Sequence, residues 1–125
     1  MLDHVSIGVR DLARAKRFYN AALKPLGYTC LSDGDDALGY GGDAIAFWVL
    51  AAARPVAADA GSGLHFCLRA PTRAAVDAFH SAALAAGGKD NGAAGLRADY
   101  GANYYAAFAI DPDGYRIEAY CGMAA

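Results

Sequence analysis

The spacing of hydrophobic and polar residues changes along the chain, and these changes predict a mixture of strands and helices. Residues 2–9 alternate, with Val5 and Ile7 on one face and His4 and Ser6 on the other. Strict alternation is the pattern of a strand that is buried on one side only. The chain therefore opens with a predicted half-buried strand.

Two stretches have the spacing of amphipathic helices, and each has a capping residue before it and glycine after it. Asp11 can cap a helix that runs to about Leu26, where Gly27 ends it. Thr72 can cap a second helix, which stops at Gly87 and the glycine after it. Two helices are expected.

Further strands are predicted between and after these helices, where turn-rich segments separate apolar stretches. Residues 28–50 hold two or three strands, and 64–70 form another. Residues 104–110 and 115–121 flank a DPDG turn and predict a hairpin. The glycine-rich stretch 92–103 is predicted to be a loop.

The first half of the sequence recurs in the second half at an offset of 61 residues. The matched pairs include His4 with His65, Phe18 with Phe79, and Gly27 with Gly88. A repeat that covers both strand-type and helix-type stretches indicates one supersecondary unit used twice. We therefore predict an α+β fold with two βαβββ repeats.

The two predicted repeats span about 2–50 and about 63–122, with a short linker between them. Neither repeat has enough helix to cover both faces of its sheet. The expected architecture is one domain over 1–125, with curved mixed sheets around a cleft.

Composition narrows the classes of function. The chain has 125 residues, a formal net charge of −2 and 19% charged residues. It has no basic stripe for nucleic acid and no apolar run of the roughly 20 residues that a membrane span needs. A small-molecule ligand is expected, and neither nucleic acid nor a membrane is an expected partner.

The cysteines and the start of the sequence favour a cytoplasmic protein. Cys30, Cys67 and Cys121 form neither a CxxC pair nor an even disulfide set, so their default interpretation is small core residues. Met1 leads directly into a predicted strand without a charged leader region.

Alternation along the strands gathers two histidines and a carboxylate in the predicted cleft. His4 and His65 open their strands on the polar side, and Glu118 lies opposite the apolar positions of the last strand. Two imidazoles and a carboxylate can hold Fe(II) or Mn(II), and also suit Zn(II) or Ni(II). The alternative is a histidine hydrogen-bonded to glutamate in a polar cleft without metal.

Aromatic residues of both repeats could line this cleft and bind substrate. The candidates are Phe47, Tyr100, Tyr105 and Tyr120. Arg116 could pair with a substrate anion, whereas Trp48 is assigned to the core by its strand position. Aromatic walls with few charges suit a flat or apolar small molecule, although rings of this kind also fill the core of a small domain.

The chain resembles the vicinal oxygen chelate superfamily over nearly all of its length. The resemblance lies in the histidine that opens each unit, the DL-x-R-A-x-x-FY run at 11–19 and the DPDGYRIE run at 111–118. That superfamily contains glyoxalase I, type I extradiol dioxygenases, fosfomycin-resistance thiol transferases and bleomycin-binding proteins. The resemblance implies that His4, His65 and Glu118 are metal ligands, that Glu118 is catalytic, and that the chain forms a homodimer.

The position of a fourth ligand separates members of this superfamily. Laying 40–47 over 111–118 places Phe47 where Glu118 falls. Glyoxalase I has a carboxylate or an amide at that position, so the resemblance favours the three-ligand pattern of the dioxygenases and fosfomycin transferases. Extradiol dioxygenases usually have four units in one chain, and the few cations near the site give a phosphonate substrate weak support.

Two functions from different classes are therefore predicted. The first is a glyoxalase-like lyase, transferase or dioxygenase that uses a divalent metal on a small substrate with vicinal oxygens. The second is a metal-free protein of the bleomycin-resistance type that sequesters a drug or metabolite. The sequence leaves open whether the ligands of one site come from one chain or from two.

Overall fold

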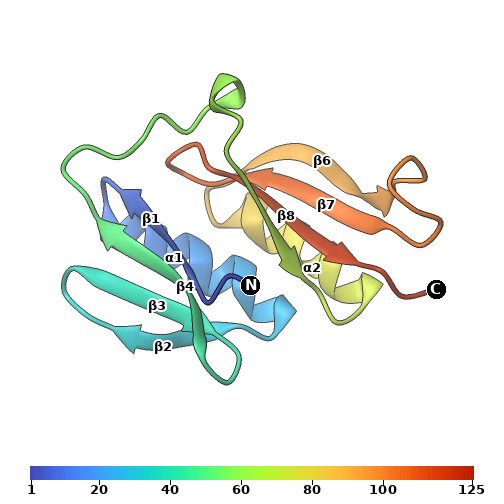
Figure 1. The fold of residues 1–125 in the computed structure, drawn as a ribbon, viewed down its shortest axis with the longest axis horizontal. Helices are drawn as coiled ribbons and strands as arrows, with labels where there is room; N and C mark the ends of the chain where they lie inside the picture. The colour runs from blue at the N-terminus through green and yellow to red at the C-terminus, as the bar shows by residue number, and fades with distance from the viewer.

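A computed structural model describes residues 1–125 and contains two α-helices and eight strands (Figure 1). The first unit consists of β1 (Val5–Val9), α1 (Leu12–Leu23), β2 (Thr29–Asp33), β3 (Ala37–Gly41) and β4 (Ile45–Ala51). The second unit consists of β5 (His65–Arg69), α2 (Arg73–Ala85), β6 (Lys89–Leu96), β7 (Tyr105–Ile110) and β8 (Arg116–Cys121). Short 3₁₀ helices occupy Lys24–Leu26 and Ala60–Ser62.

Each unit forms a four-stranded sheet with the same strand order. The orders are β1-β4-β3-β2 and β5-β8-β7-β6, and in each sheet the first strand runs parallel to the last one of its unit. The other pairings are antiparallel. The prediction of two βαβββ repeats in one domain is confirmed.

The predicted caps fix the starts of both helices. The carboxylate of Asp11 accepts a hydrogen bond from the backbone N–H of Arg14, and the hydroxyl oxygen of Thr72 accepts one from Ala75. Gly27 follows the first helix with φ at 86°, a left-handed conformation that favours glycine. The same local signals therefore open both helices.

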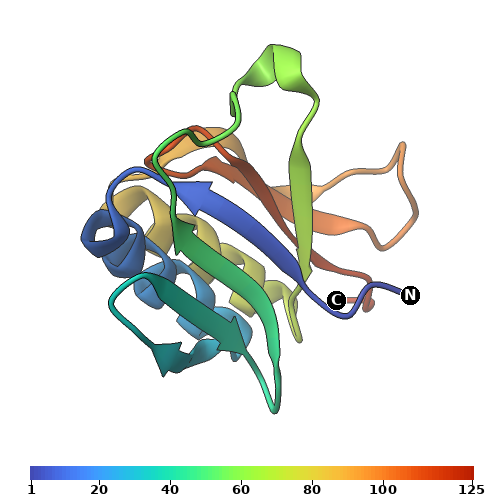
Figure 2. The same cartoon turned by 60° about the vertical axis from the view of Figure 1, so that its left-hand side comes forward.

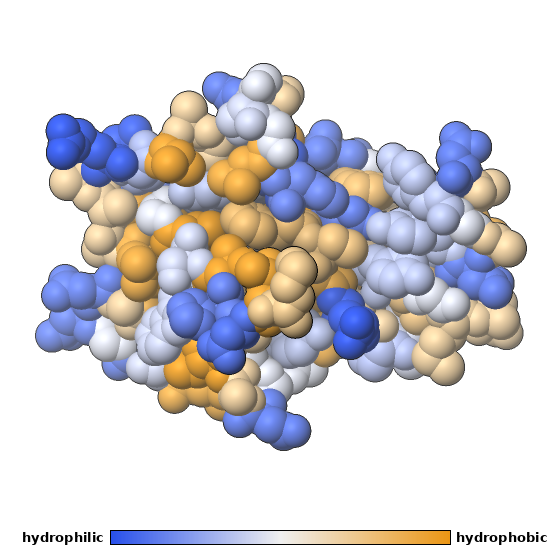
Figure 3. All heavy atoms as spheres, viewed as in Figure 1, coloured by the Kyte–Doolittle hydropathy of each residue, from blue (hydrophilic) through white to orange (hydrophobic).

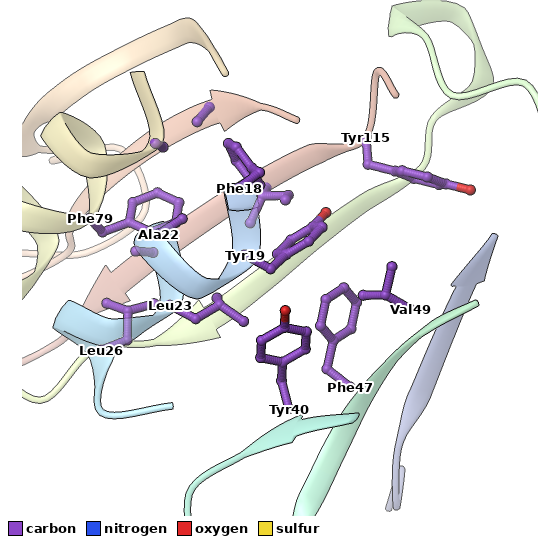
Figure 4. Packing of buried hydrophobic residues seen from close by; sticks show 14 of the residues in the cluster. Phe18, Tyr19, Ala22, Leu23, Leu26, Tyr40, Phe47, Val49, Phe79 and Tyr115 are labelled. Atoms are coloured by element: carbon purple, nitrogen blue, oxygen red, sulfur yellow. The ribbon is translucent and has the colours of Figure 1, made fainter. Parts of the chain in front are cut away.

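One face of each sheet packs against the helices, and the opposite face is open (Figure 2). The shared core is rich in aromatic residues, among them Phe18, Tyr19, Tyr40 and Phe79, which converge between the helices and the sheets (Figure 4). Neither helix is long and apolar enough to cross a membrane. This common core fixes the positions of both sheets, and with them the residues on their open faces.

The predicted loop at 92–103 is wrong for its first part, because β6 extends from Lys89 to Leu96. The strand pairs with β7 through register shifts around Gly92 and before Gly95. Glycine and alanine have low strand propensity, so pairing with β7 rather than local preference makes this segment a strand.

Asp111, in the DPDG turn, fastens the second unit to the first. The Tyr19 hydroxyl on α1 donates to Oδ2 of Asp111 at 2.5 Å, and the backbone N–H groups of Asp113 and Tyr115 donate to Oδ1. Burial raises the pKa of the Asp111 carboxyl, although these hydrogen bonds oppose the rise. One oxygen of the buried carboxylate thus joins the two units, and the other holds the turn itself.

Further bonds cross between the units beside this turn. The Tyr115 hydroxyl donates to the carbonyl of Gly8 at 2.6 Å, and Arg14 contacts Asp113 at 3.2 Å. Apart from Gly8, these residues lie in the two runs that carry the superfamily resemblance. The runs therefore dock the units, and the second run also ends in Glu118.

Candidate functional site

Glu118 is the centre of the candidate site. It lies on β8 opposite Cys67 of β5, on the sheet face turned away from α2, and only 3% of it is exposed. Its Oε1 lies 2.9 Å from Nε2 of His65, and its Oε2 accepts a hydrogen bond from the Tyr104 hydroxyl at 2.5 Å. No lysine or arginine pairs with it, and a buried carboxylate of this kind favours a cation.

Two neighbours of Glu118, Tyr104 and Cys67, have raised pKa values. Burial, followed by the hydrogen bond to Glu118, raises the pKa of Tyr104. Burial, followed by the charge of Glu118, raises the pKa of the Cys67 thiol to about 11. Both groups are therefore neutral hydrogen-bond donors at neutral pH. Cys67 is exposed on this face, so its default assignment to the core is wrong.

Within one chain, His4 does not join the His65–Glu118 pair. His4 lies just before β1, and its Nδ1 is 2.7 Å from a carboxylate oxygen of Asp3. The chain contains no group of three or more His, Cys, Asp or Glu residues close enough to hold a metal. A single chain therefore does not bring all three predicted ligands together, since β1 and β8 belong to different sheets.

Three tyrosines form an aromatic wall beside Glu118. The ring of Tyr104 lies against Tyr120, with centroids 4.1 Å apart, and contacts Tyr100 edge-on at 5.2 Å. An open hollow next to this wall is lined by His65, Asp99, Tyr100, Tyr104, Phe108 and Glu118. Of the predicted substrate-binding residues, Tyr100 lines this hollow, and Tyr120 contacts the ring of Tyr104.

Tyr105 points away from this wall, and its predicted place in the cleft is wrong. Its hydroxyl donates to Asp77 of α2 at 2.5 Å, and the Arg73 guanidinium lies over its ring. Tyr105 pairs with the buried Cys121 in the sheet, which places it on the helix side. Because side chains alternate along a strand, Tyr104 points to the opposite face, toward the site. The substrate-binding prediction omitted Tyr104.

The predicted equivalence of Phe47 and Glu118 is also wrong by one residue. In the sheets, Trp48 pairs with Ser6 as Glu118 pairs with Cys67, and Ser6 and Cys67 are equivalent in the repeat. Trp48 therefore occupies the open-face position that corresponds to Glu118. The pairing of β3 with β4 shifts register between Tyr40 and Gly41. Laying 40–47 directly over 111–118 ignores this shift and therefore misplaces the equivalent residue by one.

Phe47 lies in the core rather than on the open face. It is 9% exposed, and its ring packs against Tyr19 at 5.2 Å (Figure 4). Its ring also lies 6.1 Å from that of Phe66. The sequence predicted Trp48 to be in the core and Phe47 to be in the cleft, whereas Phe47 lies in the core and Trp48 on the open face.

Arg116 and His80 are tied to neighbours of their own. Arg116 lies opposite His65 in the sheet, and its guanidinium donates to the carbonyl of Gly114 at 2.6 Å. His80 of α2 contacts Asp90 at 2.9 Å, outside the site.

An apolar cavity of about 370 Å³ lies between the two units, on the other side of His65 from the tyrosine wall. Its lining includes Val5, Tyr28, Tyr40, Phe47 and Phe66, with His65 and Cys67 also in contact with it. In the same region, apolar side chains gather in the middle of the molecular surface (Figure 3). Its volume lies in the range of small-ligand pockets.

Comparison with known proteins matches residues 1–119 to the Glyoxalase/Bleomycin resistance protein/Dioxygenase superfamily. A glyoxalase/bleomycin resistance protein from Albidiferax ferrireducens T118 has 33% identity and a TM-score of 0.83, over 96% of this chain and 98% of that one. A fosfomycin resistance protein from Mesorhizobium loti has 15% identity and a TM-score of 0.71, over 98% and 92% of the two chains.

A bleomycin resistance determinant encoded on transposon Tn5 has 18% identity and a TM-score of 0.63, over 95% of each chain. At this identity, the last two similarities concern the fold alone. A search of curated proteins found no match.

Proposed function

Because the chain belongs to the Glyoxalase/Bleomycin resistance protein/Dioxygenase superfamily, we propose that it is a metal-dependent lyase, transferase or dioxygenase. Its substrate is a small molecule with vicinal oxygens. The observation that carries the proposal is the buried Glu118 carboxylate, which faces His65 and has no lysine or arginine partner.

The residues present fit a divalent metal. Imidazole nitrogen and carboxylate oxygen are ligands of Fe(II), Mn(II), Ni(II) and Zn(II), and His65 and Glu118 supply one of each. A metal held there supplies Lewis-acid chemistry to substrate oxygens. Glu118 is then both a ligand and the protein group at the reacting atoms, while Tyr100 and Tyr120 bind the substrate.

His4 completes this site from a second copy of the chain. It is exposed, and its own chain does not place it with His65 and Glu118. His4 lies just before β1 and His65 opens β5; both are edge strands, and apolar side chains are exposed between them (Figure 3). The proposal is therefore a homodimer whose sites are shared, and its three free cysteines suit the cytoplasm.

Metal content is the direct test. Protein purified without a metal-affinity step should contain about one metal per chain, which His65→Ala, Glu118→Gln and His4→Ala each remove. His80→Ala is the matched control, because this third histidine pairs with Asp90 outside the site, and it should keep the metal. A wild-type protein that takes up none of the four metals would contradict the proposal.

Mixing two inactive variants tests whether the sites are shared. In a heterodimer of His4→Ala and Glu118→Gln chains, one site would receive both defects and the other would be intact. Metal binding should therefore recover after the two variants are unfolded and refolded together. If each site lay within one chain, neither site of the heterodimer would recover.

The apolar cavity favours the second candidate, a metal-free protein that binds a drug or metabolite. Its 370 Å³ volume and aromatic lining suit an apolar ligand group. Calorimetry with bleomycin and chelator-treated protein would test this function. Saturable binding without turnover would support it, whereas binding only after metal is restored would favour the enzyme.

A further inference from the structure

We propose that Tyr104 is a positioning residue for Glu118. Its hydroxyl holds Oε2 of the carboxylate, so that Oε1 stays turned toward His65. The effect on a bound metal rests on the function proposed above, whereas the effect on the His65–Glu118 pair does not.

The two carboxylate oxygens of Glu118 have different partners. Oε2 accepts the Tyr104 hydroxyl at 2.5 Å, and Oε1 lies 2.9 Å from the His65 ring. The terminal torsion of a glutamate side chain is broad, so the backbone alone does not fix the plane of the carboxylate. A charge-assisted hydrogen bond to one oxygen fixes that plane.

Tyr104 is itself held firmly enough to do this. Its carbonyl accepts a hydrogen bond from the Arg97 N–H at 2.7 Å, and its N–H donates to Gly101 at 3.2 Å. Its ring lies against Tyr120 at 4.1 Å and meets Tyr100 edge-on. Backbone bonds on one side and ring contacts on the other leave the hydroxyl little freedom.

The arrangement also makes Glu118 a ligand with one available oxygen. Because the Tyr104 hydroxyl occupies Oε2, Oε1 is the oxygen that faces the histidine. Residues that orient a metal ligand through a hydrogen bond typically change metal affinity by about 10–100-fold when they are mutated. The Tyr104 hydroxyl should have an effect of this size.

Zn(II) and Mn(II) affinity provides the first test. Tyr104→Phe keeps the ring contacts and removes the hydroxyl, and it should raise the Kd about 10–100-fold. Tyr105→Phe is the matched control, since the hydroxyl of this neighbouring tyrosine donates to Asp77 outside the site, and its Kd should stay unchanged. If both variants weaken binding equally, the loss does not come from the hydrogen bond to Glu118 and the proposal fails.

A second arm asks whether Tyr104 acts through Glu118. In a Glu118→Gln background, adding Tyr104→Phe should change the residual affinity far less than it does in the wild type. An equal effect in both backgrounds would show that Tyr104 acts independently of Glu118 and would overturn the proposal.

A third arm needs no metal and separates this proposal from the proposed function. In chelator-treated protein, a double-mutant cycle of His65→Ala and Glu118→Gln measures the coupling of this pair from urea unfolding. The coupling should fall several-fold in the Tyr104→Phe background and stay unchanged in Tyr105→Phe. If the wild type binds no metal, the proposed function fails, and this cycle alone confirms or overturns the role of Tyr104.

Discussion

The two units share one scaffold and differ on their open faces. Both have the same strand order and capped helices. At equivalent positions, however, the second unit has Glu118 and the first has Trp48. The position that carries the hydrogen-bonded Glu118 carboxylate in the second unit thus carries the Trp48 indole, beside Gly39, in the first. The repeat preserves the packing against the helices, whereas the opposite face is free to differ.

The largest predicted effect separates Phe47 from its neighbour Trp48. Phe47→Ala should lower the free energy of unfolding by about 3–5 kcal/mol, because it empties a core position. Trp48→Ala should cost about 1–2 kcal/mol, because the indole is only partly buried on an open face. Urea unfolding followed by circular dichroism measures both. Equal losses would contradict the assignment of the two side chains to opposite faces.

Removing the fastening between the units should have the next largest effect. Asp111→Ala should cost about 2–3 kcal/mol, because it leaves the Tyr19 hydroxyl and two backbone N–H groups without a partner. Tyr19→Phe is the matched variant and should cost about 1 kcal/mol, since it removes one hydrogen bond. Thermal and urea unfolding give both values. A smaller loss for Asp111→Ala than for Tyr19→Phe would show that the turn does not join the units.

A smaller effect should come from the glycine beside Trp48. A Cβ on Gly39 would approach Cδ1 of Ile45 to 2.7 Å and Cζ3 of Trp48 to 2.9 Å. Gly39→Ala should therefore cost about 1–3 kcal/mol and shift the tryptophan emission. Gly42→Ala, where a Cβ meets no atom within 4 Å, should change stability by less than about 0.5 kcal/mol. An unchanged emission spectrum in Gly39→Ala would contradict this placement of the indole.

The smallest predicted effect is the pH dependence of Asp111. Burial raises its folded pKa above the unfolded value of about 3.9. The folded state thus binds the proton of the Asp111 carboxyl more tightly than the unfolded state does. The contribution of this protonation to the free energy of unfolding is complete below the unfolded pKa and is lost as pH rises through the folded pKa. Asparagine does not titrate.

The stability of wild type relative to Asp111→Asn should therefore increase as pH falls from about 7 to about 4. Urea unfolding of both proteins across this interval provides the measurement. A change in the opposite direction would mean that the hydrogen bonds to the carboxylate outweigh its burial.

The fold could be predicted because its signals are local and appear twice. Asp11 and Thr72 cap their helices, and the histidine-led strands recur at a fixed offset. The sequence did not predict most of β6, because its glycines and alanines have low strand propensity. Its strand conformation depends on pairing with β7, which local sequence patterns do not specify.

The site was predicted where alternation is uninterrupted and missed where it is not. His65 and Glu118 lie on adjacent strands in regular register, so alternation placed them together. Phe47 was misplaced because a register shift precedes it, and Tyr105 because the start of its strand could not be fixed from the sequence. The separation of His4 from the pair depends on how the two sheets are arranged, which no local pattern specifies.

The Tyr19–Asp111 fastening has a consequence for inferring function from sequence. Several residues of the runs that make this chain recognisable join its halves, and only the end of the second run, Glu118, reaches the site. A descendant could exchange its substrate or its reaction by other substitutions on the open face and still carry the same signature. The signature is therefore mainly a record of assembly, and what distinguishes the chemistry of each descendant has to be found in residues that lie outside it.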